Sequence, residues 1–327
     1  SLNAIMEAME YLLSKDKTFK HDIYLAFGGD EEVFGKSAQA IVHYFKTQNI
    51  TPYMVLDEGG AIVSHAFPGV KEKTAVVGIA EKGFLNIKLT ARSHGGHAST
   101  PPKETPLTVL SNAVVKLNNT KKFKLKLTLP ARALFETLAP HSKSFFIRML
   151  FANLWLFLPV VKLIAKRSGG EFLAMFKTTQ AFTMATGSEA INVLPSEASI
   201  GINYRLRPGQ TSSDVIKIIK KVIKDERIEV EMVEVNEAST ISVIDDGFKM
   251  LTKAINLTRP DVIVSPYLMV ATTDSRHYHP ICERVFKFSP MEVSRDDLKK
   301  IHGVDEDISM DNIKLGVQFY INLFEQL

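Results

Sequence analysis

The spacing of apolar residues near the start of the chain predicts helices and strands that alternate. Apolar side chains recur every three to four positions along residues 2–12 and again along 33–48, which indicates two helices. Short apolar runs at 23–27 and 53–56 are each followed by a turn with two glycines, and we interpret both as buried strands. Because strands that alternate with helices pair in parallel through right-handed crossovers, this region predicts an α/β fold.

The pattern changes to strict alternation in the middle of the chain. Residues 84–93, 199–209 and 228–235 alternate apolar with polar side chains, as an antiparallel strand with one solvent-facing side does. Residues 211–224 have helical spacing and begin with threonine and serine, which are good helix caps. We therefore expect an α+β domain with an antiparallel sheet to be inserted into the α/β chain.

The α/β pattern resumes after about residue 240. A helix is predicted near 247–256, an apolar strand at 261–270 and a closing helix at 310–326. The expected fold is thus a split α/β domain, with a mostly parallel sheet and helices on both faces, interrupted by a smaller domain.

Composition narrows the possible functions. The 327 residues are 45% hydrophobic, enough for packed cores in roughly two domains of about 150 residues each. The net charge of +4, from 40 basic and 36 acidic residues, is too small to indicate nucleic-acid binding. A single cysteine, Cys282, excludes an internal disulfide and a zinc site built from cysteines. A metal site in this chain would therefore use carboxylates and histidines.

One stretch, at 144–166, is apolar enough to raise the question of a membrane. Its longest charge-free run, Met149 to Val161, is shorter than the ~20 residues that a spanning helix needs. We expect a buried or interface helix there in preference to a helix on a membrane surface, and no transmembrane segment. No signal peptide is visible at the N-terminus. Weak support for a secreted protein comes from Asn-x-Thr sequons at Asn49, Asn118 and Asn256.

Acidic residues follow both of the first two predicted strands. GGDEE (28–32) follows the first strand and DEGG (57–60) follows the second. Because neighbouring strands lie about 4.8 Å apart, Glu31 or Glu32 can approach Asp57 closely. Carboxylates together with imidazoles suit zinc or a similar divalent ion. The alternatives are that the first cluster caps a helix, and that both strand ends form an ordinary polar rim.

Histidines are the other candidate ligands. His94 and His97 surround a glycine pair on a loop, and His302 lies in a polar loop before the last predicted helix. His277 and His279 have the spacing of a metal-binding pair on a strand, although most such pairs are ordinary surface histidines. No G-x-S-x-G elbow, P-loop or dinucleotide fingerprint occurs, so metal-assisted hydrolysis remains as the reaction class.

Six motifs occur in an order that resembles a known family. They are GGDEE, VLDEGG, GHASTPPKET, INVLP with YRLRPGQT, TDSR and IHGVDE. The same order is found in the two-zinc aminoacylase and carboxypeptidase family, and the branch of carboxypeptidase S and the N-fatty-acyl-amino-acid synthase/hydrolase is most similar. The resemblance implies a zinc-hydrolase catalytic domain formed by residues 1–80 and 240–327. Residues 81–239 would form a lid and dimerisation domain, with a helical insertion at about 107–180.

The resemblance also implies roles for individual residues. Glu31 matches the general base that takes a proton from the metal-bound water. Glu32 matches a ligand of one zinc ion, Asp57 a ligand of the other, and His302 a second ligand of the first. His97 matches the lid histidine that reaches into the partner subunit's site and stabilises the oxyanion.

Further matches concern the substrate. Asn192 and Arg205 match lid residues that hold the substrate's carbonyl and carboxylate, and Arg276 is also expected to face substrate. An arginine that grips a free α-carboxylate selects amides of amino acids or C-terminal peptide bonds. The implied protein is a homodimeric zinc hydrolase of N-acyl amino acids or short peptides, acting reversibly in some members and located outside the cell or in the secretory or vacuolar pathway.

The sequence departs from the family pattern in two respects. The family has an H-x-D motif and a metal-bridging aspartate before the first helix, and this sequence, which begins at Ser1, contains neither. Of the family's five metal ligands, only Glu32, Asp57 and His302 have matches. Gly29 stands where this branch usually has histidine. Two hypotheses follow: part of an active dizinc hydrolase, which the retained acids favour, or a metal-poor, non-enzymatic chain that dimerises through the lid.

Two substrate classes remain open within the enzyme hypothesis. Long-chain N-acyl amino acids would need an apolar channel, which Phe145, Phe146, Trp155 and Phe157 could line. We favour a role for these side chains in the lid core or a dimer interface. Small peptides with a free carboxyl end are the alternative substrates.

Overall fold

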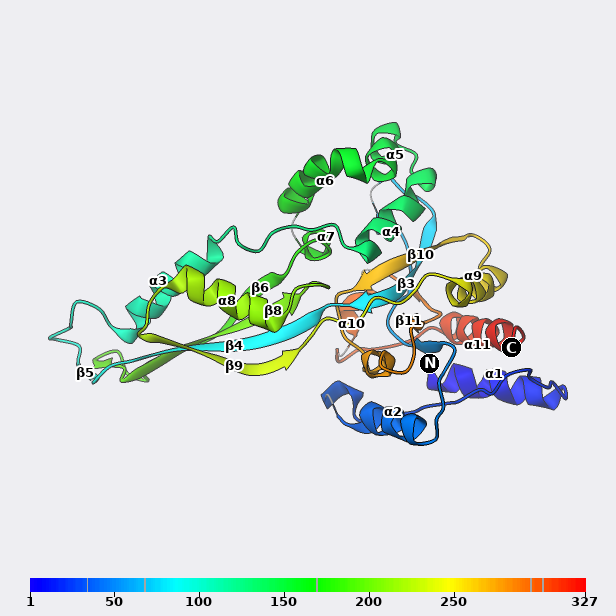
Figure 1. Ribbon diagram of the computed structural model, residues 1–327, viewed down its shortest axis with the longest axis horizontal. Helices are drawn as coiled ribbons and strands as arrows, with labels where there is room; N and C mark the ends of the chain where they lie inside the picture. The colour runs from blue at the N-terminus through cyan, green and yellow to red at the C-terminus, as the bar shows by residue number, and fades with distance from the viewer. Residues whose placement is uncertain (34, 68, 169, 295, 302) are drawn as a thin grey trace. The chain divides into compact units, whose positions relative to one another are not determined.

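The computed structural model describes residues 1–327 except 34, 68, 169, 295 and 302 (Figure 1). The chain divides into two compact units. The first unit comprises residues Ser1–Glu81, Leu129–Val161 and Thr240–Leu327, and the second comprises Lys82–Thr128 and Lys162–Ser239.

The sheet of the first unit is mixed, with the strand order β1-β11-β3-β2-β12 and with β10 paired to β3. The pairs β1–β11, β10–β3 and β12–β2 are parallel, whereas β11–β3 and β2–β3 are antiparallel. The expected α/β class is confirmed. The strands are β1 (Val55–Asp57), β2 (Ile62–Val63), β3 (Lys73–Glu81), β10 (Val262–Met269), β11 (Val285–Lys287) and β12 (Glu292–Val293).

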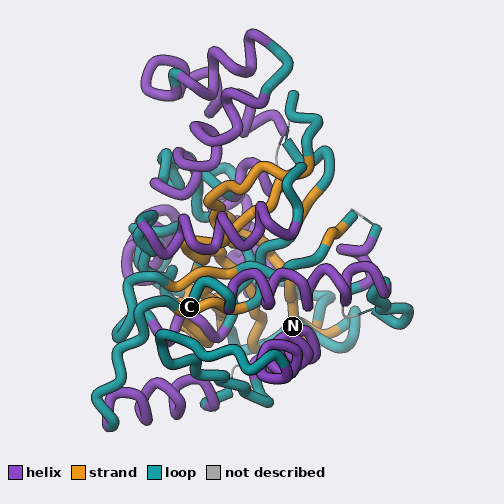
Figure 2. Tube along the Cα trace, turned by 90° about the vertical axis from the view of Figure 1, so that its right-hand side faces the viewer, coloured by secondary structure: helices purple, strands orange, loops and turns teal. Residues whose placement is uncertain are grey.

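Helices pack on this sheet through apolar faces that the sequence spacing predicts. The helix residues Ala8, Leu251 and Phe319 belong to one core with Phe286 of β11 and Phe288, which follows β11. They come from α1 (Leu2–Ser14), α9 (Asp246–Thr258) and α11 (Met310–Phe324). Figure 2 views α1 along its axis, beside the N-terminal label. A separate apolar cluster joins α2 (Ser37–Thr47) to the segment around Tyr278 and Cys282.

The expected strand at 23–27 is wrong. This segment is extended chain outside any strand, and Tyr24, Leu25 and Phe27 are exposed. An apolar run becomes a strand only if a neighbour can exchange hydrogen bonds with it, and no strand among the described residues does so. The acidic sequence GGDEE therefore follows a loop, whereas the second expected strand is confirmed as β1.

The second unit contains a four-stranded antiparallel sheet with the order β6-β8-β4-β9. Leu85, Ile87 and Leu89 alternate with polar residues and are buried against α3 and α8. Thr211 caps α8 and forms a capping box with Asp214. The elements are α3 (Pro106–Asn118), β4 (Gly83–Arg92), β6 (Thr179–Thr186), β8 (Glu197–Leu206), α8 (Ser212–Ile223) and β9 (Ile228–Asn236), and the pair β5 (Gly96–His97) and β7 (Val193–Leu194) forms a separate small ladder.

The helical insertion is divided between the two units, whereas the sequence analysis placed all of it in the inserted domain. Residues 129–161 cluster with the first unit, although the sequence analysis placed them in the inserted domain, because α4 (Leu129–Leu138) packs on β10. After α4 come α5 (Phe145–Ala152), α6 (Leu154–Ser168) and α7 (Gly170–Ala174). In the part of the chain that the structure describes, no single helix is long and apolar enough to cross a membrane. Only α5 and α6 together pass that test of length and composition, with a bend of 115° between them.

Candidate functional site

The acidic residues of GGDEE have different surroundings, because Asp30 binds backbone N–H groups whereas Glu31 and Glu32 lie on a short helix. The Asp30 carboxylate accepts hydrogen bonds from the backbone N–H of Lys36 at 2.8 Å and of Ser37 at 3.3 Å, at the start of α2. The helix-capping interpretation therefore holds for Asp30. Glu31 and Glu32 instead lie on the short 3₁₀ helix η1 (Glu31–Val33), where Glu31 is half-buried and Glu32 is exposed.

Asp57, at the end of β1, is held by two backbone donors. Its Oδ1 accepts from the N–H of Glu58 at 2.8 Å, and its Oδ2 accepts from the N–H of Ser275 at 2.9 Å. Ser275 belongs to the 3₁₀ helix η3 (Asp274–Tyr278), which contains the DSR of the TDSR motif and therefore Arg276. Two motifs separated by more than two hundred residues in sequence thus meet at one strand end.

Negative charges from three segments surround Glu31. Burial raises the pKa of Glu31 to about 7, and the charges of Glu32, Glu58, Asp274 and Asp57 add to the rise. Like charges raise one another's pKa only when they lie near each other with little compensation. The acids of η1, of the β1 end and of η3 therefore form one electrostatic cluster, which we call the carboxylate cluster. Asp274 was not singled out by the sequence analysis, which included Glu58 only as part of the acidic sequence DEGG.

The carboxylate cluster has the chemistry of a cation site, but its described side chains are not arranged around one common point. Carboxylate oxygens suit divalent ions, and a cation would relieve the mutual repulsion of these acids. Within the described ranges, however, no three His, Cys, Asp or Glu side chains are grouped so that they could hold one metal ion. His302, expected as a zinc ligand, lies outside the described residues.

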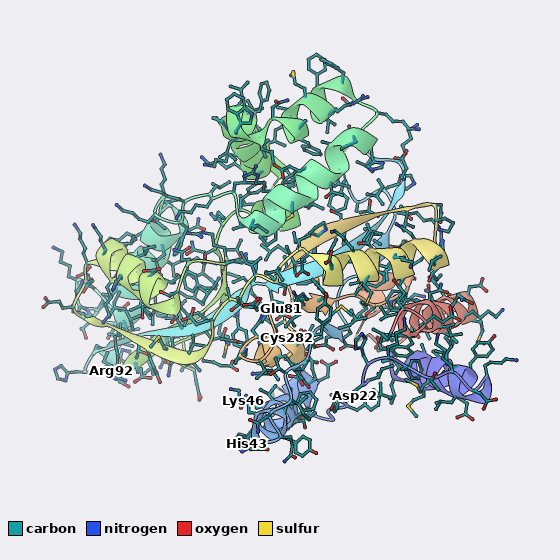
Figure 3. The ribbon with its side chains drawn as sticks, turned by 45° about the vertical axis from the view of Figure 1, so that its right-hand side comes forward. Asp22, His43, Lys46, Glu81, Arg92 and Cys282 are labelled. Carbon is teal, nitrogen blue, oxygen red and sulfur yellow. The ribbon has the colours of Figure 1, made fainter. Side chains whose placement is uncertain are left out.

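A buried ion pair supports the loop that binds Asp57. Lys287 Nζ lies 3.6 Å from Glu81 Oε1, and the two side chains are 0% and 1% exposed. Figure 3 labels Glu81 within the first unit. Glu81 also accepts hydrogen bonds from Thr273 Oγ1 at 3.0 Å, from Thr273 N at 3.2 Å and from Ser275 Oγ at 3.3 Å. The sequence analysis missed this pair, although its signal was visible as a charged residue at the end of each of two apolar strands.

The histidine pair at 277 and 279 shows no arrangement for metal binding. His277 Nε2 accepts from Arg276 Nε at 3.5 Å, at the limit of a hydrogen bond. Both ring nitrogens of His279 are buried, and neither has a hydrogen-bond partner among the residues with described positions. Burial, with the positive charge of Lys287, lowers the pKa of His279 to about 4. His279 is therefore neutral at physiological pH.

In the second unit, the structure brings His97 and Asn192 together. His97 on β5 pairs with Val193 on β7, and the N–H of Ala98 donates to the backbone oxygen of Asn192 at 3.0 Å. Both predicted site residues are exposed. His97 Nδ1 lies 2.8 Å from Ser99 Oγ and accepts from the Ser99 N–H at 3.2 Å. These contacts orient the ring through Nδ1, so a catalytic role would fall to Nε2.

Arg205 lies on β8 of the four-stranded sheet, next to the end of β4 that is far from His97. It pairs with Phe84 near the start of β4, whereas His97 follows the end of β4 (Figure 1). At about 3.3 Å per residue, the eight residue steps from Phe84 to Arg92 span roughly 26 Å. The guanidinium lies 5.8 Å from the centre of the Phe84 ring, and burial lowers the pKa of Arg205. Within one copy of the chain, His97 and Arg205 therefore cannot contact the same amide group.

Lys82 is a second buried cation that the sequence analysis did not find. Its Nζ donates to the backbone oxygens of Ala174 and Lys177, both at 3.0 Å. Burial lowers the pKa of Lys82 to about 7, helped by the positive charges of Arg205 and Lys177. The Lys82 ammonium thus ties the chain that follows α7 to the start of β4.

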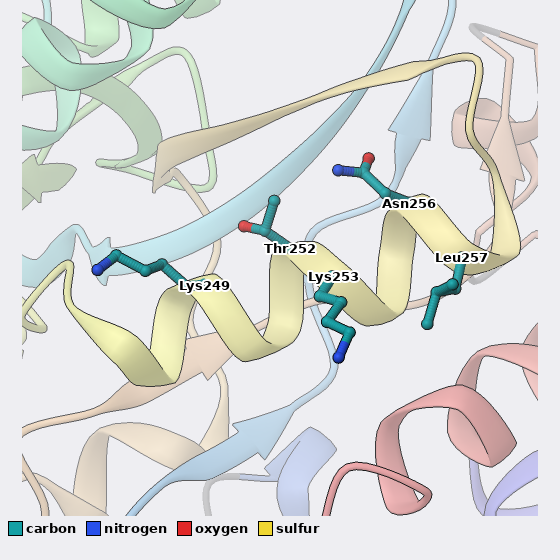
Figure 4. Close-up of a pocket in the computed structure, with 5 residues that line it drawn as sticks. All are labelled: Lys249, Thr252, Lys253, Asn256 and Leu257. Atoms are coloured by element: carbon teal, nitrogen blue, oxygen red, sulfur yellow. The ribbon is translucent and has the colours of Figure 1, made fainter.

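The pocket drawn in Figure 4 is separate from all of these residues. It has a volume of about 380 Å³ and lies on α9, where Lys249, Thr252, Lys253, Asn256 and Leu257 line it. None of the predicted site residues contributes to it.

Comparisons with known proteins connect these features to a family. Residues 79–231 match the model of the peptidase dimerisation domain M20_dimer. The chain is 38% identical to the probable carboxypeptidase S-like 2 of Dictyostelium discoideum, over 99% of this chain and 63% of that protein. It is 33% identical to the N-fatty-acyl-amino acid synthase/hydrolase PM20D1 of Mus musculus, over 99% of this chain and 65% of that protein. The chain thus spans less than two thirds of these relatives.

A solved structure agrees with the fold. The M20 family metallo-carboxypeptidase Sso-CP2 from Sulfolobus solfataricus superposes with a TM-score of 0.69 at 16% identity, covering 98% of this chain and 74% of that one. At this identity the similarity concerns the fold alone. The comparisons therefore show that residues 79–231 form a peptidase dimerisation domain of the M20 type. They also show that the whole chain is similar to carboxypeptidase S-like and N-fatty-acyl-amino acid synthase/hydrolase proteins, in a fold shared with an M20 metallo-carboxypeptidase.

Proposed function

We propose that the protein is a metal-dependent hydrolase of amide bonds that lie next to a free carboxylate. The observation that carries this proposal is the carboxylate cluster, in which acids from η1, the β1 end and η3 share one electrostatic environment. The names of the relatives support the substrate class, since they include carboxypeptidase S-like proteins and N-fatty-acyl-amino acid synthase/hydrolases. The substrates would be N-acyl amino acids, including N-fatty-acyl ones, or peptides with a free carboxyl end.

In this proposal Glu31, Glu32 and Asp57 of the cluster divide between proton transfer and metal binding. Glu32, Asp57 and His302 would hold zinc, with further ligands completing the two-zinc site. When bound, zinc supplies Lewis-acid polarisation of the amide carbonyl and lowers the pKa of water. Glu31 would act as the general base, taking a proton from the attacking water and delivering it to the departing amine. The Ser275 N–H keeps the Asp57 carboxylate in a fixed orientation for this work.

Substrate recognition would come from the remaining predicted residues. Arg205, and Arg276 beside the carboxylate cluster, would bind the substrate's carboxylate, because a guanidinium forms paired hydrogen bonds with a carboxylate. Asn192 and His97 would bind the carbonyl oxygen and stabilise the charge that develops on it. Because His97 and Arg205 lie near opposite ends of β4, we propose that they serve one substrate from different copies, which requires a homodimer. An extracellular or secretory location remains part of the proposal.

The test compares the rates at which an N-acyl amino acid and its C-terminal amide are hydrolysed. Both the 327-residue chain and the longest natural form of the protein are assayed. We expect hydrolysis of the free acid alone, loss of activity in chelator and recovery with added zinc. Glu31→Gln should lower kcat by about 10²–10⁴-fold, whereas the exposed Glu7→Gln on α1 should leave it unchanged.

Two results would contradict particular parts of this proposal. Equal turnover of the amide would contradict recognition of the substrate's carboxylate by an arginine. Activity that survives chelation would contradict the requirement for a metal. A chain that dimerises in solution but neither binds zinc nor turns over substrate would support the non-enzymatic alternative.

A further inference from the structure

Helices α5 and α6 present apolar side chains to solvent. Phe145, Phe146 and Trp155 are 70%, 71% and 80% exposed. On α6 the buried positions are Leu154, Val161 and Ala165, and the exposed side of the helix is itself apolar. A surface helix normally turns its apolar stripe to the core and its polar side to water, so this exposed side requires a partner. We define the apolar face as Phe145, Phe146, Trp155, Leu156 and Val160, all exposed and all in the first unit.

The apolar face is fixed on the first unit and is not a loose appendage. Phe151 of α5 packs against Phe135 of α4, with ring centres 4.8 Å apart. The N–H of Lys143 donates to the Gly69 oxygen at 2.9 Å, which ties the start of α5 to the loop before β3. Asn153 forms the corner between the helices and donates from Nδ2 to the Met149 oxygen at 3.0 Å. These contacts fix one side of α5 against the unit while the phenyl rings at its start remain in water.

The charged residues within the segment that carries the apolar face have one sign, although Glu72 from the loop before β3 lies near Lys143. No aspartate or glutamate occurs in the sequence between Glu136 and Glu171. The same segment contains five cationic residues, namely Lys143, Arg148, Lys162, Lys166 and Arg167. Aromatic side chains combined with lysine and arginine alone complement an anionic phospholipid surface, where the rings enter the headgroup region and the cations meet phosphate and carboxylate groups.

We propose that the apolar face docks this protein on an anionic phospholipid surface, with α5 and α6 lying along it. The geometry favours this orientation, because the two helices are bent by 115° and cannot form one straight span. The long side chains of Arg148 and Lys162 can cover apolar area while their charged ends reach the headgroups. The proposal departs from the preference for a buried or interface helix in the sequence analysis, and it does not depend on the hydrolase proposal.

The chain provides its own reporter for this interaction. Trp155 is the only tryptophan, so intrinsic fluorescence observes the apolar face directly. With vesicles of phosphatidylcholine containing about 30% phosphatidylserine, we expect a blue-shifted Trp155 emission and co-sedimentation of the protein. Binding should be about 10-fold or more weaker with pure phosphatidylcholine vesicles and should fall at high salt, because the cationic part of the attraction is screened.

Two double variants distinguish vesicle binding through the apolar face from non-specific binding by exposed apolar side chains elsewhere. Phe145→Ser with Phe146→Ser should weaken vesicle binding by about 10-fold or more while leaving Trp155 in place. The matched control, Leu13→Ser with Leu257→Ser, removes two exposed apolar side chains outside the face and should bind as the parent does. Circular dichroism checks that both double variants fold.

Several outcomes would overturn the proposal. They are an unshifted Trp155 emission with no co-sedimentation, an equal loss of binding in the control, and equal binding to neutral and anionic vesicles. A dimer in light scattering that depends on Phe145 and Phe146, in a protein that ignores vesicles, would show that a second copy covers the face.

Discussion

The buried pair of Glu81 and Lys287 should be a large single contributor to the stability of the first unit. The two charges lie 3.6 Å apart with almost no solvent access. Burial lowers the pKa of Lys287, and the negative charges of Glu81 and Asp57 oppose that effect. Glu81→Gln would keep the size of the side chain and remove its charge, so an ammonium would remain buried without its partner. Breaking one side of such a pair costs about 3–5 kcal/mol.

The expected loss of stability in each variant depends on how many buried charged groups are left without a partner. A loss of about 3 kcal/mol corresponds to a fall in Tm of roughly 6–12 °C for a unit of this size. Lys287→Met should cost less than Glu81→Gln, because the Glu81 carboxylate keeps its bonds from Thr273 and Ser275. The double variant, Glu81→Gln with Lys287→Met, removes both charges and should regain most of the loss.

The assay is urea unfolding followed by circular dichroism, with calorimetry as a second probe. Asp246→Asn serves as the control, since it breaks an ion pair with Lys249 whose side chains are 82% and 79% exposed, and it should cost less than about 1 kcal/mol. A Glu81→Gln protein within about 1 kcal/mol of the parent would refute the reasoning. So would a double variant no more stable than Glu81→Gln alone.

Three further predictions concern the two units separately. The pKa of Lys82 falls from 10.5 to about 7 on folding, so the unfolded chain binds the extra proton between these values and the free energy of unfolding should rise with pH there. Lys82→Met should flatten that rise, by up to about 1.4 kcal/mol per pH unit, in urea titrations across pH 7–10. Gly60→Ala should destabilise by about 1–3 kcal/mol because its Cβ would meet the Val76 carbonyl oxygen, whereas Gly29→Ala enters open space; equal Tm values for the two would contradict this. Thr211→Ala removes the cap of α8 and should cost about 1 kcal/mol, measured by thermal unfolding, and an unchanged Tm would show that the cap contributes nothing.

The sequence predicts those parts of the fold whose pattern is local. The alternating side chains of 84–93 become β4, with Leu85, Ile87 and Leu89 buried on one side, because strand periodicity directly determines which side chains share a face. The same applies to α1, α8 and α11, whose apolar stripes follow helical spacing. Of the site, the two acidic motifs and TDSR were recognised from sequence, although the bond from Ser275 to Asp57 that joins them required the structure.

The sequence-based predictions failed where a structural feature depends on contacts between residues that are distant in sequence. Residues 23–27 have the apolar character of a strand, but a strand also needs a neighbour, which composition does not specify. The burial of Glu81 and Lys287 depends on two strands that meet only after folding. The segment 144–166 was expected to form a buried or interface helix, and its exposed rings show that hydrophobicity alone does not determine whether a helix is covered within one chain.

Zinc binding tests the central claim that Glu32 and Asp57 belong to a divalent-cation site. The metal-free protein is titrated with zinc by calorimetry at neutral pH, beside Asp57→Asn, Glu32→Gln and the exposed Asp246→Asn on α9 as a control. The account predicts stoichiometric binding to the parent and the control, and an affinity lower by about 10–100-fold or more in each of the two site variants. Equal zinc affinity in all four proteins, or no binding to the parent, would contradict it.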